Sequence, residues 1–319
     1  MRVCVLTNVY NASGVIRDYL DSLTRQTFRD FELLIVDDGS TDDTVEIVRE
    51  YEDSLRIRLL KLPHVGLNAA RAKGIEAVDA DVCIILDADE IAEPEAIAGF
   101  VEPFVADPGV GAVGGKLEAW GDGWVVAGTR VMRDAVFRLR RARRQGDEAW
   151  VIPGGCLAVR LKAVRDVGGF TFKDGVADDY DICWRLRKAG WKLKTKNTIV
   201  VHHREPTTLK KVFLRKRDAG MHAVRTFWHH KKMLLDWRSL GALYPAGIVG
   251  AAIWQPWLGL ALIAGTLLGA QVLFWPTRAT LREKLWGWIL LNVYSSGYTI
   301  GFFTELLRAT VGSSAVARR

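Results

Sequence analysis

The sequence predicts an α/β protein with a mainly parallel sheet, helices on both faces of that sheet, and interfacial and transmembrane helices at the C-terminal end. Three observations support this prediction. Short apolar runs alternate with segments of helical spacing in the N-terminal part of the chain, which is the pattern of a parallel sheet with crossover helices. Two of these apolar runs end in aspartates. From residue 239 onward the sequence is dominated by long apolar segments.

Three strand and helix units and a fourth strand make up the N-terminal alternation. The predicted strands are rich in β-branched and other apolar residues and comprise residues 2–11, 31–36, 57–62 and 82–86. Helical spacing follows the first three strands, at residues 15–23, 45–51 and 66–77. Ser40 and Asp43 have the spacing of a capping pair, so they are expected to open the second helix.

The fourth predicted strand ends in the acidic sequence Asp87-Ala88-Asp89-Glu90. Ligands of open α/β sheets bind at the C-terminal ends of the strands, and two carboxylates one residue apart can hold one hard cation. A divalent metal that binds a diphosphate is therefore the natural interpretation. The alternative is structural, with Asp87 and Asp89 as a strand end and an N-cap before a helix that starts in the acidic segment 90–95.

A second acidic pair, Asp37 and Asp38, follows the strand at 31–36. Parallel topology would place it at the same sheet edge as Asp87 and Asp89, where like charges need a cation or hydrogen-bond donors to offset them. The sequence contains neither a G-x-G-x-x-G after the first strand nor a G-x-x-x-x-G-K-[ST] motif, which argues against a dinucleotide fold and a P-loop. The phosphates of a ligand would then be held by a metal.

Charge and cysteine content limit the possible partners and the compartment. Lys and Arg number 44 against 37 Asp and Glu, a formal net charge of +7, and this small excess does not indicate a nucleic-acid partner. The 4 cysteines are widely spaced without a C-x-x-C pair, as expected of reduced core thiols in the cytosol. The first apolar run is too short for a signal peptide, so the N-terminal domain is expected to be cytosolic.

Residues 110–160 are expected to form the acceptor side of the protein. Residues 109–120 have strand character, 180–189 helical character, and 193–201 the character of an edge strand. A dense group of arginines lies between them, namely Arg130, Arg133, Arg138, Arg140, Arg141, Arg143 and Arg144. An Arg-rich helix is usually a solvated face, but the concentration of charge here favours an acidic lipid headgroup or a phosphate-bearing acceptor.

Several motifs occur in a fixed order along the chain. They are Val3 to Asn11, Ile35 to Asp42, Gly66 to Ile75, Leu86 to Asp89, Gly154-Gly155-Cys156, Val167 to Phe170 and Ala177 to Leu186. In this order they resemble the signatures of the inverting family 2 glycosyltransferases, and the resemblance covers about residues 1–205. It implies a Rossmann-like GT-A fold, a nucleotide-sugar donor and a divalent metal, Mn²⁺ or Mg²⁺. One departure is Ala72, where relatives often carry Asn.

The resemblance also implies roles for individual residues. Asn8, Tyr10 and Asp38 would line the nucleotide base and ribose, with help from Arg71. Asp87 would address the ribose and diphosphate of the donor. Asp87 and Asp89 together would address the metal.

The catalytic base that the resemblance implies is Asp179, the second acid of the pair Asp178-Asp179. Inverting transfer needs one base to take a proton from the acceptor hydroxyl as it attacks the anomeric carbon. A partly desolvated carboxylate near other carboxylates has its pKa raised toward that task. Relatives more often have Glu in place of Asp178. One of the pair could also be only the N-cap of the helix at 180–189.

His202 resembles the family's metal-binding histidine, since an imidazole can complete a metal shell beside two carboxylates. An ordinary surface histidine is the alternative, and the neighbouring His203 is a second candidate for the same role. Processive synthases of the family carry Q-x-x-R-W after this point. This chain has Phe213-Leu214-Arg215-Lys216-Arg217-Asp218 instead, so chain polymerisation is not expected.

The chain is expected to divide into three parts. Residues 1–205 form the cytosolic catalytic domain, 206–238 form basic interfacial helices with tryptophans, and 239–319 form a transmembrane region. Two or three apolar segments lie in that region, at about 240–254, 257–275 and 285–307. The positive-inside rule fits two crossings better than three, because a third would place the C-terminal arginines outside.

We therefore predict a membrane-anchored, multi-pass, metal-dependent inverting glycosyltransferase of the cell membrane, with its catalytic domain in the cytoplasm. It would transfer a sugar from a nucleotide-sugar donor to a lipid-linked or membrane-proximal acceptor, as in the synthesis of cell-envelope glycans. One alternative is transfer to polyprenyl phosphate, an acceptor that is already ionised. A non-enzyme alternative is a membrane scaffold with a degenerate sugar-binding domain, against which the intact acidic motifs argue.

Overall fold

The computed structural model describes residues 1–142, 147–170, 178–230 and 276–316, together with 265, 268, 269, 273 and 274. The described residues form two compact units. The first comprises those within 1–118 and 147–204, and the second comprises those within 119–142 and 205–316. The first unit ends at Arg204, and residues 119–142 belong to the second unit.

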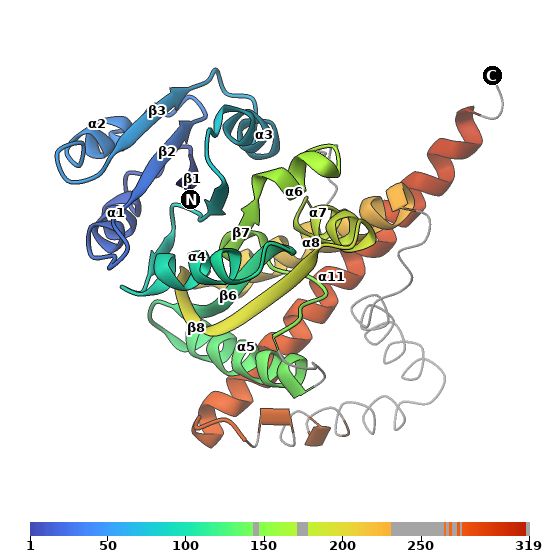
Figure 1. Ribbon diagram of the computed structural model, residues 1–319. Coiled ribbons are helices and arrows are strands. Elements are labelled where there is room, and N and C mark those ends of the chain that lie inside the picture. The colour runs from blue at the N-terminus through green and yellow to red at the C-terminus, as the bar shows by residue number, and fades with distance from the viewer. Residues whose placement is uncertain are drawn as a thin grey trace. The chain divides into compact units, whose positions relative to one another are not determined.

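The first unit is built on one eight-stranded sheet, with the strand order β3-β2-β1-β4-β7-β6-β8-β5 (Figure 1). The strands are β1 (Val3–Val9), β2 (Phe31–Asp37), β3 (Ile57–Lys61), β4 (Val82–Ile85), β5 (Glu90–Ala92), β6 (Val110–Trp120), β7 (Leu157–Arg160) and β8 (Lys192–Arg204). The first four pair in parallel, as the sequence predicts.

β5 and β7 pair in antiparallel fashion with their neighbours, so the prediction of a mainly parallel sheet is wrong beyond β4. β7 runs antiparallel to both β4 and β6, and β5 runs antiparallel to β8. The connection from β6 to β7 starts and finishes at the same end of the sheet instead of crossing over, which makes that pair antiparallel. Periodicity alone does not distinguish such a return from a crossover. The sheet is therefore mixed.

Side chains of alternate residues in the strands enter two separate cores, one on each face of the sheet. One core contains Val5 and Ile84 and is covered by three helices, α1 (Ile16–Thr24), α2 (Thr44–Arg49) and α4 (Ala96–Ala106). The other contains Leu6 and Ile85 and is covered by α3 (Leu67–Ala77), α6 (Leu161–Asp166) and α7 (Asp178–Lys188). Helices on both faces of the sheet are thus confirmed (Figure 1).

Three local predictions need correction. The N-cap of α2 is Asp43, and the Ser40 hydroxyl instead accepts a hydrogen bond of 3.0 Å from the N–H of Asn11. The acidic segment 90–95 does not begin a helix, because its first residues form β5, which pairs with β8, and α4 begins only at Ala96. β8 is also not an edge strand, since β5 lies outside it. Tertiary pairing decides all three.

The second unit contains the long helices α5 (Trp124–Ala142), α8 (Leu209–His230) and α11 (Leu281–Val316). α8 and α11 approach closely at glycines. A Cβ at Gly297 would lie 2.7 Å from the Phe213 carbonyl oxygen, and one at Gly301 would overlap the Arg217 carbonyl. Small residues permit this backbone contact. Within the part of the chain that the structure describes, no helix has both the length and the apolar content to cross a membrane, and this holds for α11, which includes residues 285–307.

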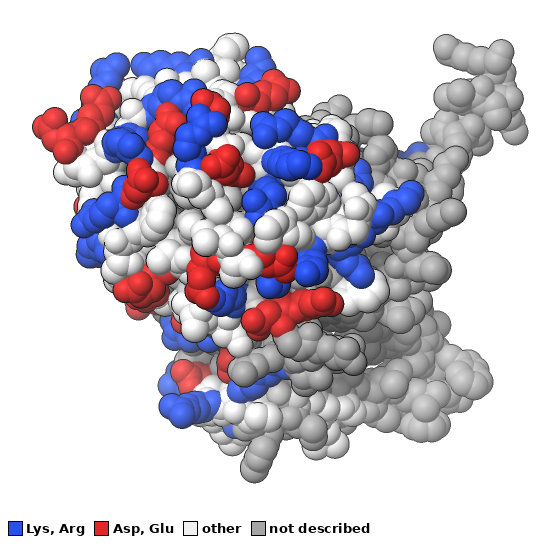
Figure 2. Space-filling model, in the orientation of Figure 1, with Lys and Arg blue, Asp and Glu red and all other residues white. Residues whose placement is uncertain are grey.

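The predicted apolar segments 240–254 and 257–275 fall almost entirely outside the described residues, as do Arg143 and Arg144 and the side chains of Arg140 and Arg141. The remaining arginines of α5 have partners within the second unit. Arg133 pairs with the buried Glu205, and Arg138 pairs with Asp134 at 3.1 Å. On the face shown in Figure 2, basic and acidic side chains are interspersed, in keeping with the small net charge.

Gln26, after the end of α1, is a buried link between α1 and the segment that connects β5 to α4. Its amide nitrogen donates to the carbonyl oxygens of Ala92 (3.2 Å) and Glu93 (2.9 Å), and its Oε1 accepts from the Ile97 N–H (3.0 Å).

Gln26→Ala should lower the free energy of unfolding by about 2 kcal/mol or more, because buried polar groups lose their partners. Denaturant unfolding measures this. Glu52→Ala, at an exposed position, is the control and should change the free energy of unfolding by less than about 0.5 kcal/mol; equal effects would contradict the proposed link.

Candidate active site

The acidic ends of β2 and β4 lie at one edge of the sheet, on either side of β1, as predicted. Asp38 is buried and accepts hydrogen bonds from the N–H groups of Val65 (2.7 Å) and Gly66 (2.9 Å). His64 places its Nδ1 3.1 Å from Asp38 Oδ2. The carboxylate therefore holds the loop before α3 close to the end of β2, in addition to any contact with a ligand.

Asp87, directly beyond β4, is paired with a buried arginine. Arg71 on α3 is 6% exposed and places its Nη2 2.9 Å from Asp87 Oδ1. The side chain of Asp87 remains about one third exposed. A buried guanidinium is costly without a partner, so this ion pair fixes the end of β4 relative to α3 and leaves one carboxylate edge available. Two of the predicted site residues are thereby brought together.

Glu90 is a functional candidate that the sequence analysis did not assign to the site. It is fully buried, and its Oε2 accepts a 2.9 Å hydrogen bond from the N–H of Asp87. Burial raises the pKa of the neighbouring Cys156 thiol, and the charge of Glu90 adds to that increase. The signal was present in the sequence, because Glu90 is the third carboxylate of the acidic run, but only its place at the start of β5 turns it inward.

Glycines at the 3-10 turn Gly154–Cys156 allow a close approach to these carboxylates. A Cβ at Gly155 would overlap Glu90 Oε1 and lie 3.0 Å from Asp87 Oδ2. The chain therefore needs glycine here for a steric reason, because the backbone of this turn lies directly against the acidic groups.

Asp179, in the first turn of α7, reaches the same turn. Its Oδ2 accepts a 3.2 Å hydrogen bond from the N–H of Gly154, and its Oδ1 accepts one of 2.9 Å from the N–H of Tyr180. The turn that carries Gly154 and Gly155 thus links Asp179 to Asp87, from elements far apart in the sequence. The side chain of Asp178 lies outside the described residues.

Asn8 and Tyr10, at the end of β1, are placed on the same edge as Asp38. The Asn8 Nδ2 atom is buried and has no hydrogen-bond partner among the described residues. The Tyr10 ring is 47% exposed and stacks on His64, with ring centroids 4.2 Å apart. An unused buried donor beside an exposed aromatic ring suits a planar, polar ligand such as a nucleotide base. His64 was not singled out from the sequence.

The two histidines of β8 have different neighbours. His202 places its Nε2 2.7 Å from Glu93 Oε1, whereas the buried His203 places its Nε2 3.8 Å from Asp89 Oδ2. Adjacent strand residues point to opposite faces, so only one of the two can lie next to Asp89. The structure places His203 there, and not His202 as expected.

Among the described residues, no three His, Cys, Asp or Glu side chains are gathered into a ready-made metal site. Mg²⁺ is commonly held by one or two carboxylates together with phosphate oxygens of a substrate. The side chain of Asp89 is 40% exposed and lies beside the imidazole of His203. These two side chains alone cannot surround a metal ion, so they fit a metal that is also bound by a ligand.

A family model described as "Glycosyl transferase family 2" matches residues 4–168, just over half of the chain. The poly-beta-1,6-N-acetyl-D-glucosamine synthase of Staphylococcus aureus (strain MSSA476) is 26% identical over 197 residues, which cover 60% of this chain and 47% of that protein. The chain thus spans about half the length of this curated relative.

Two solved structures are similar in fold. The mannosyltransferase PcManGT from Pyrobaculum calidifontis, in complex with GDP-Man and Mn²⁺, has a TM-score of 0.62 at 20% identity, covering 96% of this chain and 87% of its own. S. aureus TarS 1–349 in complex with UDP-GlcNAc has a TM-score of 0.50 at 14% identity, covering 93% and 92%. At these identities the likeness shows the fold alone, which is of the GT-A type.

The close approach at Gly155 can be tested by one added carbon atom. Gly155→Ala should lower the free energy of unfolding by about 1–3 kcal/mol, because its Cβ would displace the buried Glu90 and crowd Asp87. Thermal or denaturant unfolding measures the change.

Gly14→Ala is the matched control, since no atom lies within 4 Å of a Cβ at that position. It should change the free energy of unfolding by less than about 0.5 kcal/mol. If both substitutions have the same effect, Gly155 is not required for steric reasons.

Proposed function

The chain belongs to glycosyl transferase family 2, and we propose that it transfers a sugar, with inversion, from a nucleotide-sugar donor to a lipid-linked or membrane-proximal acceptor. One observation carries this proposal above the others. The turn Gly154–Cys156 brings Asp179 to the same sheet edge as the pair of Arg71 and Asp87. A candidate base and a candidate donor site are then close enough to act on one pair of substrates.

The donor would bind across the ends of β1, β2 and β4. The exposed face of Tyr10 is suited to a base, and the free donor of Asn8 to a polar group on it. Asp38 shapes the adjacent loop 64–66. Arg71 holds one edge of Asp87, so the other edge can accept a hydrogen bond from a ribose hydroxyl. These contacts would orient the donor so that its anomeric carbon faces the turn that contains Gly154.

Asp89 and His203 are the residues that would hold a divalent cation, Mn²⁺ or Mg²⁺, together with the donor diphosphate. When bound, the cation would neutralise negative charge on the departing diphosphate. We place His203 in this role instead of His202, because the contact of His202 is with Glu93.

Asp179 would be the general base. A carboxylate oxygen of Asp179 takes the proton of the acceptor hydroxyl while the hydroxyl oxygen bonds to the anomeric carbon, and the bond from this carbon to the diphosphate breaks on the opposite side. The hydrogen bonds from Gly154 and Tyr180 hold the carboxylate in one orientation, so that it needs no rearrangement during the reaction.

We further propose that the second unit attaches the enzyme to the cytoplasmic face of the cell membrane. α8 carries many Lys and Arg residues next to apolar ones, which suits an anionic interface. Its close backbone packing with α11 at Gly297 and Gly301 resembles the packing of membrane helices. The region 239–275, which is apolar in sequence, would supply the crossings.

Two other functions remain distinct alternatives. Transfer to polyprenyl phosphate would use an ionised acceptor and would make Asp179 nearly dispensable for proton transfer. A scaffold with a degenerate sugar-binding domain would not hydrolyse or transfer from any donor. The pairing of Arg71 with Asp87 and the contact of Asp179 with Gly154 favour an active enzyme over such a scaffold.

Asp179→Asn should preserve donor affinity and reduce turnover by a factor of about 10² to 10⁴, because it removes the general base without changing the size of the side chain. The measurement is single-turnover transfer with saturating donor, after a panel of UDP-, GDP- and dTDP-sugars has identified which one binds. A much smaller loss would favour the polyprenyl phosphate alternative.

Asp178→Asn is the matched control for that experiment. α7 begins at Asp178, so neither acid of the pair is its N-cap, contrary to the alternative that the sequence offered. If Asp178 only stabilises the first turn of the helix through its charge, Asp178→Asn should cost about 1 kcal/mol or less in stability and leave turnover unchanged. An inactive Asp178 variant beside a nearly normal Asp179 variant would overturn the assignment of the base.

Asp89→Asn should abolish the metal-dependent part of nucleoside diphosphate binding, since it removes a charged ligand at a partly exposed position. Calorimetry with UDP and GDP, with Mn²⁺ or with EDTA, measures this part separately. His203→Gln should also weaken it, while His202→Gln should not. A variant at Asp89 that binds as the wild type does with Mn²⁺ would show that the metal site is wrongly placed.

A further inference from the structure

Three tryptophans of the first unit each have a cationic side chain over the indole ring. Arg187 lies over Trp150 at 3.6 Å from the ring centroid, Lys188 over Trp184 at 5.1 Å, and Lys162 over Trp191 at 5.5 Å. Trp150 is 73% exposed, although it is one of the largest apolar side chains of the unit. An exposed tryptophan beside basic side chains is typical of sites that contact a membrane interface.

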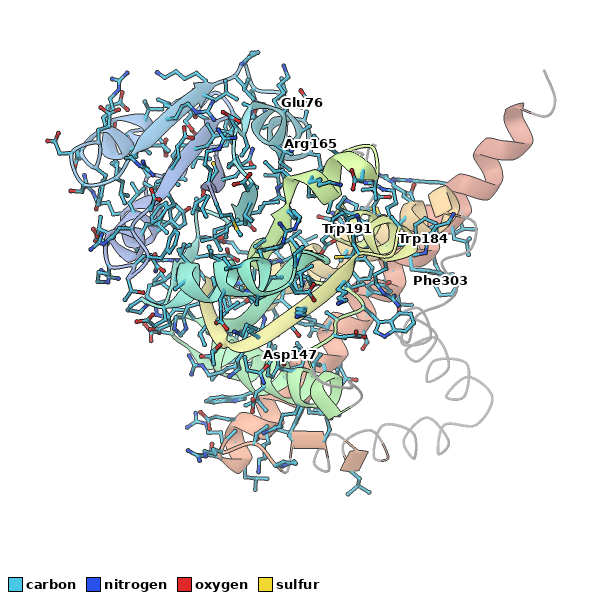
Figure 3. The ribbon with its side chains drawn as sticks, viewed as in Figure 1. Glu76, Asp147, Arg165, Trp184, Trp191 and Phe303 are labelled. Atoms are coloured by element: carbon cyan, nitrogen blue, oxygen red, sulfur yellow. The ribbon has the colours of Figure 1, made fainter. Side chains whose placement is uncertain are left out.

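Three of these six groups lie on one side of α7. Trp184, Arg187 and Lys188 are related by i, i+3 and i+4, so they share a helix face. Figure 3 labels Trp184 on this helix. The opposite face of α7 carries Ile182 and Leu186, which are buried in the core against the sheet. Lys188, at the end of this outer face, is exposed. We call Trp150, Trp184, Trp191, Lys162, Arg187 and Lys188 the tryptophan face.

The positive charge of this face is not neutralised locally. Neither Arg187 nor Lys188 has a carboxylate within ion-pair distance among the described residues, whereas Lys162 pairs with Asp166 at 2.9 Å. Basic side chains in the last turn of a helix also stabilise its C-terminus, which would account for part of the charge. The helix dipole does not explain the exposed indole of Trp150, because it favours charged side chains and not aromatic ones.

We propose that the tryptophan face binds the headgroup layer of an anionic lipid bilayer, so that the catalytic unit itself touches the membrane. Indole rings prefer the headgroup region, where their apolar body and polar N–H are both accommodated, and Lys and Arg are attracted to anionic lipids. A soluble polyanion would bind the charges, but it would leave the exposed indole of Trp150 without an apolar environment.

This inference deepens the proposed membrane-proximal acceptor and rests on it for its biological meaning. α7 carries the candidate base Asp179 in its first turn and the tryptophan face toward its end. Binding of that face to lipid would therefore hold one end of α7 at the headgroup layer. An acceptor that emerges from the same layer would be presented within about 15 Å of the base, the length of a helix of this size.

The experiment uses the full chain with one introduced thiol. The 4 native cysteines are buried, and burial raises the pKa of Cys4 to about 12 and that of Cys83 well above its ordinary value, so a labelling reagent should select an exposed new thiol. Ala189→Cys places an environment-sensitive fluorophore beside the tryptophan face, and Asp53→Cys places one near α2, on the opposite face of the sheet. Vesicles of phosphatidylcholine with about 30% phosphatidylglycerol carry a nitroxide quencher in the headgroup region.

We expect the label at position 189 to be quenched about twofold or more on anionic vesicles and less on neutral ones, and the label at 53 to be unaffected. Arg187→Glu together with Lys188→Glu should remove the quenching at 189. The control, Arg25→Glu together with Arg29→Glu, changes the net charge equally at exposed positions beyond α1 and should leave it in place.

Flotation of the same labelled protein separates the possible failures. If the chain floats with the vesicles while position 189 is not quenched, the second unit binds membrane and the tryptophan face does not. If the chain does not float, both the face and the proposed membrane attachment are wrong, whereas the turnover tests of Asp179 stand on their own. A fluorescence change at 189 with soluble polyphosphate but not with vesicles would also overturn the inference, in favour of a soluble polyanion.

Discussion

The ion pair between Arg71 and Asp87 joins the two halves of the candidate donor site. Arg71 is buried on α3, on one face of the sheet, and Asp87 stands at the end of β4. A buried guanidinium without a partner would be strongly unfavourable, so the end of β4 is held where the acidic run can reach ligands. The same position sets the location of Glu90. The carboxylate of Glu90 accepts a hydrogen bond from the Asp87 N–H, and Glu90 is the first residue of β5, which pairs with β8.

Next to this ion pair, glycines allow the backbone to lie close to the acidic side chains. Gly155 lies against the carboxylates of Glu90 and Asp87, and Gly154 donates its N–H to Asp179. The antiparallel strand β7 carries this turn to β4, in the half of the sheet that departs from simple strand and helix alternation. The mixed topology thus brings Asp179 of α7, the proposed base, to the ends of the parallel strands.

The two units meet different physical requirements. The first buries two apolar cores on either side of a sheet and exposes polar groups at one edge. The second is built from long helices whose contacts depend on glycines and on ion pairs such as that of Arg133 with the buried Glu205. Membership of the family rests on the first unit, since the matched residues 4–168 lie mostly within it, whereas the curated relatives extend well beyond the length that this chain shares with them.

The sequence by itself determined the parallel half of the sheet, the helices on both faces and the edge at which the aspartates gather, because hydrophobic periodicity and strand order are local and repetitive signals. Only the tertiary structure decided which residues face that edge. In the folded chain His203, and not His202, lies next to Asp89, and Glu90 points inward at the start of β5. Asp38 accepts a hydrogen bond from the loop before α3, and Ser40 accepts one from Asn11 instead of capping α2. Each of these depends on pairing between segments distant in sequence. A shift of one residue in strand register reverses which side chain points inward, and no local pattern reports that register.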